Sequence, residues 1–212
     1  MKHPLRHNAM PRRTLQGSAA LLLCLGLVTE ALADPVIDQI EAAKRAYENN
    51  ESQVAIQALN FAVAQIQEQQ TAKQLELFPE PLPGWTAEKA TAESGGIAAM
   101  LTGKVLSRTY RNETSGAEVQ ITVSANAPFL GALTSLMQMP MLLQADPSTS
   151  LYTHGSYRGM LKEDPGGDLE VSLMVGSNIM LQLSGSNGAD RAALESYLEA
   201  MDIAAMQQAL TG

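Results

Sequence analysis

A proline-rich segment at 78–84 divides this chain into two parts with different secondary structure. Pro79, Pro81 and Pro83 fall within five residues. Proline lacks a backbone N–H, and it disfavours helical geometry in the residue before it. We therefore expect the segment to run extended and stiff. Apolar residues recur at helical spacing before it and largely alternate after it. The chain is thus predicted to have a helical part over 34–77, a Pro-rich joint over 78–84 and an α+β domain over 85–212.

The part before the joint is predicted to be an antiparallel helical hairpin. Two apolar stripes follow a period of about 3.6 residues and are separated by the short polar turn 49–52. A glutamine-rich stretch at 65–74 is expected to be the solvated end of the hairpin. The two stripes consist of Val36, Ile37, Ile40, Ala43 and Tyr47, followed by Val54, Ile56, Leu59, Ala62, Val63 and Ile66.

The part after the joint alternates between strand and helix patterns. Trp85 is expected to begin the first strand, and Asp202 to cap the second half of a closing helix or helix pair over 189–209. Another helix is predicted from Pro128 to about Met139. Short polar loops between strands favour hairpins. We predict an α+β fold with a mostly antiparallel sheet packed with two or more helices. Strands are expected over 98–111, 117–125, 152–162 and 169–183.

The first 33 residues have the pattern of a secretory signal peptide. Four basic residues lead into an apolar run at 19–28, and Ala31-Leu32-Ala33 is a small-x-small cleavage site. The run is shorter than the roughly 20 residues that a spanning helix needs. We predict cleavage after Ala33 and a periplasmic location, with an uncleaved anchor as the alternative. Residues 12–15 faintly resemble a twin-arginine signal, so both export routes stay open.

Cleavage would change the charge and the redox character of the protein. It would leave 179 of 212 residues, and the 14 basic and 22 acidic residues would fall to 10 and 21, a net charge of −11. Nucleic-acid binding is not expected, because it requires basic residues to neutralise phosphates. The remaining chain would contain no cysteine and no membrane span. Its stability would therefore come from an apolar core rather than from disulfides.

Motifs for catalysis or metal binding are scarce. His154 is the single histidine after residue 33, and no Gly-x-Ser-x-Gly turn is present. Glu163, Asp164 and Asp168 flank a Pro-Gly-Gly turn, which is either a polar hairpin loop or a weak site for a hard cation such as calcium. We predict no catalytic residue and no cofactor. A hydrolase with an unrecognised carboxylate site is an alternative, and it would need a deep cleft lined by acidic groups.

The methionines Met137, Met139 and Met141 suggest a second alternative. Thioethers are soft ligands that suit Cu(I), so the segment 137–141 predicts a small-ligand or Cu(I) binder. Methionine also fills irregular cores, and an apolar helix packed on the sheet explains the same residues. Residues two apart on a regular helix point about 200° apart. Convergence of all three sulfurs would therefore require a break at Pro140.

Five short motifs stand out along the chain: Ala43-x3-Tyr47, Ala55-x3-Leu59-x2-Ala62, Pro79-x-Pro81-Leu82-x-Gly84-Trp85, Ser124-Ala125-Asn126-Ala127-Pro128 and Met201-Asp202-Ile203. Together they resemble a family of secreted proteobacterial proteins that has no assigned activity. The resemblance implies an exported protein with this architecture, and it carries no catalytic residue over. The part over 85–212 also loosely resembles the PsbP/Mog1 type of α+β fold, whose members are usually accessory or binding proteins.

These observations together predict a soluble periplasmic accessory or binding protein rather than an enzyme. The hairpin would offer a surface to another periplasmic or envelope protein, or it would pack on the α+β domain and complete it. An exposed apolar stripe on the hairpin would distinguish the first arrangement from the second. The sequence leaves the identity of the partner and the oligomeric state open.

Overall fold

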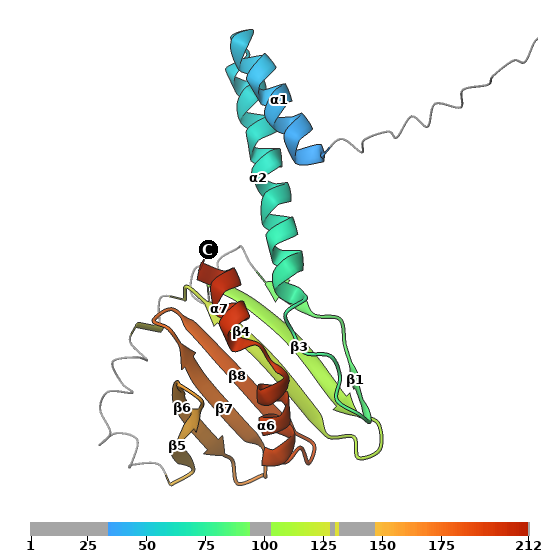
Figure 1. Cartoon of the computed structure of the whole chain (residues 1–212), viewed down its shortest axis with the longest axis vertical. Coiled ribbons are helices and arrows are strands. Elements are labelled where there is room, and N and C mark those ends of the chain that lie inside the picture. The colour runs from blue at the N-terminus through green and yellow to red at the C-terminus, as the bar shows by residue number, and fades with distance from the viewer. Residues whose placement is uncertain (1–33, 94–102, 128–129, 132–146, 212) are drawn as a thin grey trace, which may run out of the picture.

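The computed structural model describes residues 34–93, 103–127, 130–131 and 147–211, and the statements below concern those residues. A helical hairpin precedes an eight-stranded antiparallel sheet, and two further helices lie against one face of that sheet (Figure 1). The predicted α+β class is confirmed. The first 33 residues, and with them the predicted signal peptide, lie outside the described residues.

The predicted helical hairpin is confirmed. Helix α1 spans Pro35–Glu48 and α2 spans Ser52–Leu75. The carboxylate of Asp34 accepts a hydrogen bond of 2.9 Å from the Val36 amide and caps α1. Asn50 adopts a φ of 62° in the turn between the helices. Asparagine tolerates this left-handed geometry better than most residues, so the turn follows from local sequence.

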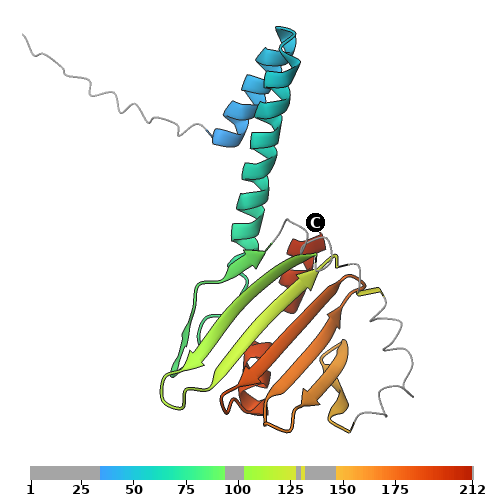
Figure 2. The same cartoon turned by 180° about the vertical axis from the view of Figure 1, so that it is seen from behind.

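The sheet contains eight strands, and each pairing between neighbours is antiparallel. Its order is β1-β3-β4-β8-β7-β6-β5, with β2 paired to another part of β3 (Figure 2). Trp85 begins the first strand, as predicted. The strands are β1 Trp85–Ala87, β2 Thr91–Glu93, β3 Lys104–Asn112, β4 Glu118–Ala125, β5 Thr149–His154, β6 Tyr157–Glu163, β7 Leu169–Val175 and β8 Ile179–Ser186.

Two predicted strands were wrong, because each is a hairpin of two strands. The segment 152–162 reverses at Gly155 and the segment 169–183 reverses at Gly176, where φ is 58° and 66°. Glycine adopts such left-handed angles without a steric penalty. In the second hairpin, Val175 pairs directly with Ile179. These residues are an even number of positions apart, so the alternation of apolar residues continues through the turn and conceals it.

The chain closes with the pair of helices allowed by the sequence. Helix α6 spans Arg191–Ala200 and α7 spans Ile203–Thr211. Asp202 accepts a hydrogen bond of 2.9 Å from the Ala205 amide, which confirms its predicted role as a cap. Both helices contribute to a core with the sheet, and its largest fully buried side chains include Leu106, Tyr110, Ile121, Leu173, Leu181, Leu183, Leu194, Tyr197 and Leu198.

The two faces of the sheet differ in polarity. On β8, Ile179, Leu181 and Leu183 are buried on the face that the helices cover, whereas Met180 and Gln182 alternate with them and are partly exposed. This alternation is typical of an antiparallel sheet with one covered face. The helix predicted over 128–139 falls almost entirely outside the described residues, although Leu130 and Gly131 are helical.

Candidate interaction surface on the helical hairpin

The hairpin projects away from the sheet rather than packing over it. In Figures 1 and 2, α1 lies beside the distal part of α2, and the proximal part of α2 runs alone to the sheet. At a rise of about 1.5 Å per residue, the 24 residues of α2 extend roughly 36 Å and the 14 residues of α1 roughly 21 Å. The hairpin therefore does not complete the core of the α+β domain, which was one of the two predicted arrangements.

The two helices contact each other mainly through alanine. Ala43 and Ala46 of α1 and Ala55 and Ala62 of α2 are all buried, with 2–5% of their surface exposed. Val36 is buried at the start of α1. Small side chains allow two helices to approach closely, and that approach leaves no room between them for larger residues. The large apolar side chains of both helices therefore lie outside the contact.

Nine large apolar side chains of the hairpin are exposed, by 39–73%. In the rest of the described chain, Leu151 is the only other large hydrophobic residue found so exposed. This concentration on one element is the stripe that the sequence analysis required for a partner-binding hairpin. The nine are Ile37, Ile40 and Tyr47 on α1 and Val54, Ile56, Leu59, Phe61, Val63 and Ile66 on α2.

Seven of the nine follow a buried residue by one or four positions on the same helix. Leu59 follows Ala55 by four, for example, and Val63 follows Ala62 by one. At about 100° per residue, both spacings rotate the side chain in the same sense from the helix contact. Because α1 and α2 run in opposite directions, the same rotation about each helix axis turns the side chains toward the same side of the hairpin. We call this side the hairpin face, and it comprises Ile37, Ile40, Tyr47, Ile56, Leu59, Val63 and Ile66.

The remaining two exposed residues lie on the opposite side of the hairpin. Val54 precedes Ala55 by one position and Phe61 precedes Ala62 by one, so their side chains rotate in the other sense. The large apolar residues are therefore distributed unequally, seven to one side and two to the other. This asymmetry indicates a surface with one preferred side.

The hairpin face carries little charge. The distal part of α2, residues 52–67, contains no Asp, Glu, Lys or Arg. Four of the five charged residues of α1 pair along their own helix, with Lys44 3.9 Å from Glu48 and Arg45 3.6 Å from Glu41, and the fifth is Asp38 in its first turn. Recognition at this face would therefore depend on burial of apolar surface rather than on charge.

The proximal end of α2 is anchored to the sheet. The side-chain amide of Gln74 donates a hydrogen bond of 2.6 Å to the Ala209 carbonyl of α7. The ammonium of Lys104 donates to the Thr71 hydroxyl at 2.8 Å and also contacts the Gln74 side-chain oxygen. Burial lowers the pKa of Lys104. The stretch 65–74 is mostly exposed, as predicted, but the buried Gln74 is an exception that the sequence analysis missed.

The predicted methionine site cannot be located, because Met137, Met139 and Met141 lie outside the described residues. The Cu(I) alternative therefore stays a prediction. Elsewhere, Met201 and Met206 are buried in the core, with 6% and 2% exposed. Met174 and Met180 pair across β7 and β8 on the face that α6 and α7 leave uncovered. Methionine thus occupies both core and surface positions in this protein.

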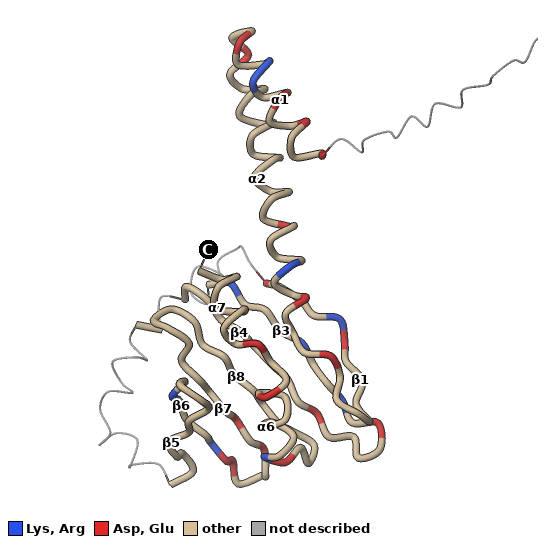
Figure 3. The backbone as a smooth tube through the Cα atoms, in the orientation of Figure 1, with Lys and Arg blue, Asp and Glu red and all other residues tan. Residues whose placement is uncertain are grey.

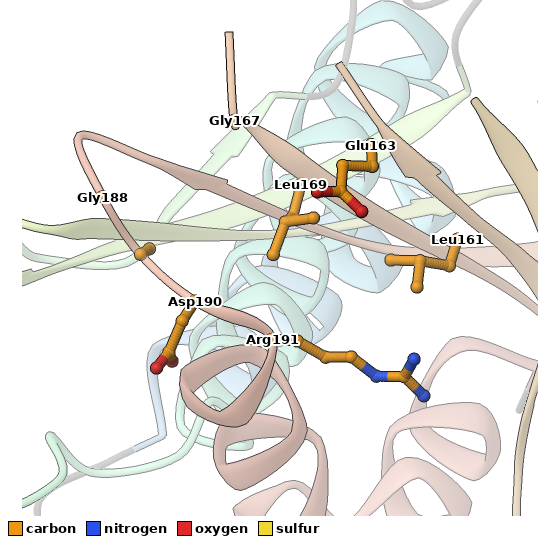
Figure 4. Close-up of a pocket in the computed structure, with 8 residues that line it drawn as sticks. Leu161, Glu163, Gly167, Leu169, Gly188, Asp190 and Arg191 are labelled. Atoms are coloured by element: carbon orange, nitrogen blue, oxygen red, sulfur yellow. The ribbon is translucent and has the colours of Figure 1, made fainter. Parts of the chain in front are cut away.

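A pocket of about 400 Å³ near the start of α6 contains two carboxylates, Glu163 and Asp190 (Figure 4). Asp190 caps α6 by accepting a hydrogen bond of 2.9 Å from the Ala193 amide. In Figure 4 its side chain points away from Glu163. The Arg191 guanidinium is 2.8 Å from Glu195 instead. The pocket therefore does not bring these carboxylates together as an acid and base pair, and the hydrolase alternative stays a prediction.

The acidic turn between β6 and β7 is stabilised by an ion pair and a backbone hydrogen bond. Asp164 forms an ion pair of 2.8 Å with Lys162, and the Asp164 amide donates to the Asp168 carbonyl. Acidic and basic residues are interspersed over the sheet (Figure 3). Within the described residues, no group of three or more His, Cys, Asp or Glu is placed to hold a metal ion. The turn has the geometry of a polar hairpin loop.

Comparison of the chain with protein-family models, with curated proteins and with solved structures finds no match in any of the three. In the described residues, no helix is both long and apolar enough to cross a membrane. Evidence on function therefore comes from the geometry of the hairpin.

Proposed function

We propose that this protein is a periplasmic accessory protein that acts by binding another protein through its hairpin face, without catalysis. The observation that carries the proposal is the hairpin face itself. Seven large apolar side chains lie on one side of a projecting hairpin that hydrogen bonds hold to the sheet at its base. Contiguous apolar patches of this kind mark interaction sites in proteins that otherwise bury such residues.

The extent of the hairpin face suits a protein partner. A large apolar side chain presents on the order of 100–200 Å² when fully exposed. Seven residues exposed by about half therefore offer roughly 500 Å² of apolar surface. A stable interface buries about 800 Å² on each partner, so these residues would form most of the interface and their polar neighbours its rim.

The position of the face on two helices supports the same proposal. Paired helices present side chains at fixed spacings, and apolar faces of this kind bind other helices or helical bundles. Binding would remove the hairpin face from water without moving the sheet. The α+β domain would then set the direction in which the hairpin approaches its partner.

Site-specific photo-crosslinking tests the proposal. A photoreactive residue replaces Leu59 on the hairpin face or Gln57, an exposed residue on another side of α2. We expect a discrete adduct in cells from position 59, none from position 57, and loss of the position-59 adduct when Ile56 becomes Asp. Adducts of equal yield from both positions, or none from position 59, would contradict the proposal.

The proposed location has its own test. The protein recovered from the periplasm is expected to begin at Asp34, because Ala31-Leu32-Ala33 is the predicted cleavage site. Intact mass measurement after cell fractionation determines both the compartment and the first residue. An uncleaved chain that stays in the cytoplasm would overturn this part of the proposal.

A further inference from the structure

We infer that the partner of the hairpin face is a second copy of this chain, so that two hairpins form a four-helix bundle related by a two-fold axis. The inference deepens the function proposed above and rests on it, because it assigns an occupant to the same face. It is supported by the packing, the charge and the dimensions of the hairpin.

The packing of the hairpin leaves a core incomplete. Helices bury their apolar stripes against a second layer of structure, and two helices form only one layer. Here the contact between α1 and α2 uses the small residues Ala43, Ala46, Ala55 and Ala62. The seven large side chains of the hairpin face still require a second layer. A second hairpin applied to the hairpin face would supply that layer and produce the core of a four-helix bundle.

The charge of the hairpin face permits contact with itself. A two-fold axis brings the same surface of both copies together, so any unpaired charge on it would meet a like charge. Residues 52–67 carry no charge, and Lys44, which lies at the rim of the face, is paired with Glu48 on its own helix. A partner with a charged surface would gain no ion pairs here, whereas a second copy meets no repulsion.

The length of α2 allows two copies to associate without a clash between their sheets. Beyond Ile66, α2 continues for nine residues to Leu75, or about 14 Å. The tip of the hairpin extends only six residues from Ile56 to Asn50, or about 9 Å along the axis. In an antiparallel arrangement, the tip of each hairpin would lie beside the polar part of its partner's α2. This arrangement gives a structural reason for the glutamine-rich part of α2, which has no α1 beside it.

The polar residues of that segment would then form the rim of the interface. Gln67 and Gln70 follow Ile66 by one and four positions and are exposed. Gln70, one helical turn beyond Ile66, therefore continues the hairpin face toward the sheet, and Gln67 lies at its edge. In the dimer they would face the tip of the second hairpin and raise the buried area toward the roughly 800 Å² that each copy needs.

Measurement of mass in solution tests the inference. We expect the protein recovered from the periplasm to sediment as a dimer at 1–100 µM, roughly the range in which micromolar or tighter association is detectable. Leu59→Glu, on the hairpin face, should weaken dimerisation at least about 100-fold. Phe61→Glu is the matched control, because Phe61 is 51% exposed against 48% for Leu59 but lies on the opposite side. It should remain dimeric, and circular dichroism should show equal helix content in both variants.

The outcomes separate this inference from the proposed function. A wild-type protein that is monomeric at 100 µM, or a dimer that survives Leu59→Glu, would overturn the inference. If position 59 then crosslinks to a different protein in cells, the proposed function stands with another partner. If position 59 crosslinks to nothing, both fail. A position-59 adduct with the mass of two copies of this chain supports both.

Discussion

The hydroxyl of Tyr110 donates a hydrogen bond of 2.8 Å to the carbonyl oxygen of Pro79 inside the core. The same carbonyl accepts a second hydrogen bond of 3.1 Å from the Arg108 guanidinium. Both donors belong to β3, so the Pro-rich joint is fastened to the middle of a strand rather than left as a free linker. This attachment, only four residues after Leu75, helps determine the direction in which α2 leaves the sheet.

Removal of the Tyr110 hydroxyl should reduce stability. Tyr110→Phe deletes one buried hydrogen bond while the ring stays in place, so we expect a loss of about 1–1.5 kcal/mol in the free energy of unfolding. Urea denaturation measures it. Tyr157→Phe is the control, since Tyr157 is only partly buried and lies on β6 away from the hairpin, and it should change stability by less than about 0.5 kcal/mol. Equal effects of the two substitutions would show that the joint is not held in this way.

Stability should also fall in alkaline solution. Burial raises the pKa of Tyr110 and of Tyr197 above the ordinary value of about 10. The unfolded chain therefore loses these protons at a lower pH than the folded protein does. Their contribution to stability is complete below about pH 10 and declines as the pH rises further. Urea denaturation between pH 9 and 11 should show this decline, and Tyr110→Phe should make it shallower. An unchanged slope would contradict the assignment to Tyr110.

Gly159 should not tolerate a side chain. It lies in β6 between β5 and β7, and a Cβ atom there would overlap the Ser172 carbonyl of the neighbouring strand. Gly159→Ala is expected to cost about 1–3 kcal/mol because the strands must separate. Gly166→Ala, in the turn after β6, has no atom within 4 Å of the added carbon and should be nearly neutral. Thermal denaturation compares the two, and similar midpoints would refute the tight strand packing.

The close contact between α1 and α2 should be sensitive to size. Ala62 is only 2% exposed, so Ala62→Leu would force the helices apart, and α1 would lose its packing and open its own backbone hydrogen bonds more often. Hydrogen exchange in α1 should accelerate at least about tenfold, which corresponds to about 1.4 kcal/mol. Ala64→Leu adds the same volume at an exposed position of α2 and should leave the exchange unchanged. If the α1 amides of the Ala62 variant stay as protected from hydrogen exchange as those of the wild type, the helices do not contact each other through alanine.

The anchor at the base of α2 should restrict the orientation of the hairpin. Gln74→Ala removes the hydrogen bond to Ala209 and the contact with Lys104. Distances measured by spin labels on α2 and on β7 should spread over a broader range in this variant. Gln69→Ala, five residues before Gln74 and exposed, should leave the distribution narrow. A distribution equally narrow in both would show that Gln74 does not hold the hairpin.

Much of the fold could be predicted because its signals are local. Helical spacing indicated α1 and α2, Trp85 marked the first strand, and Asp202 marked the cap of α7. The hairpins at Gly155 and Gly176 were missed, because alternation of apolar residues reports which face a residue occupies and not the direction of the strand. The glycines themselves were the available signal, since both adopt a positive φ.

The apolar residues of the hairpin and their helical spacing can be recognised from the sequence alone. The sequence did not determine which of them would be buried, because Ala43 and Ile40 belong to the same stripe. Contacts in the folded protein establish that α1 and α2 meet through alanines, that Gln74 is anchored beside Lys104, and that the hairpin points away from the sheet. Burial depends on what lies opposite a residue, and that is set by contacts between segments distant in the chain. The hairpin face exists because those contacts cover the small residues and leave the large ones exposed.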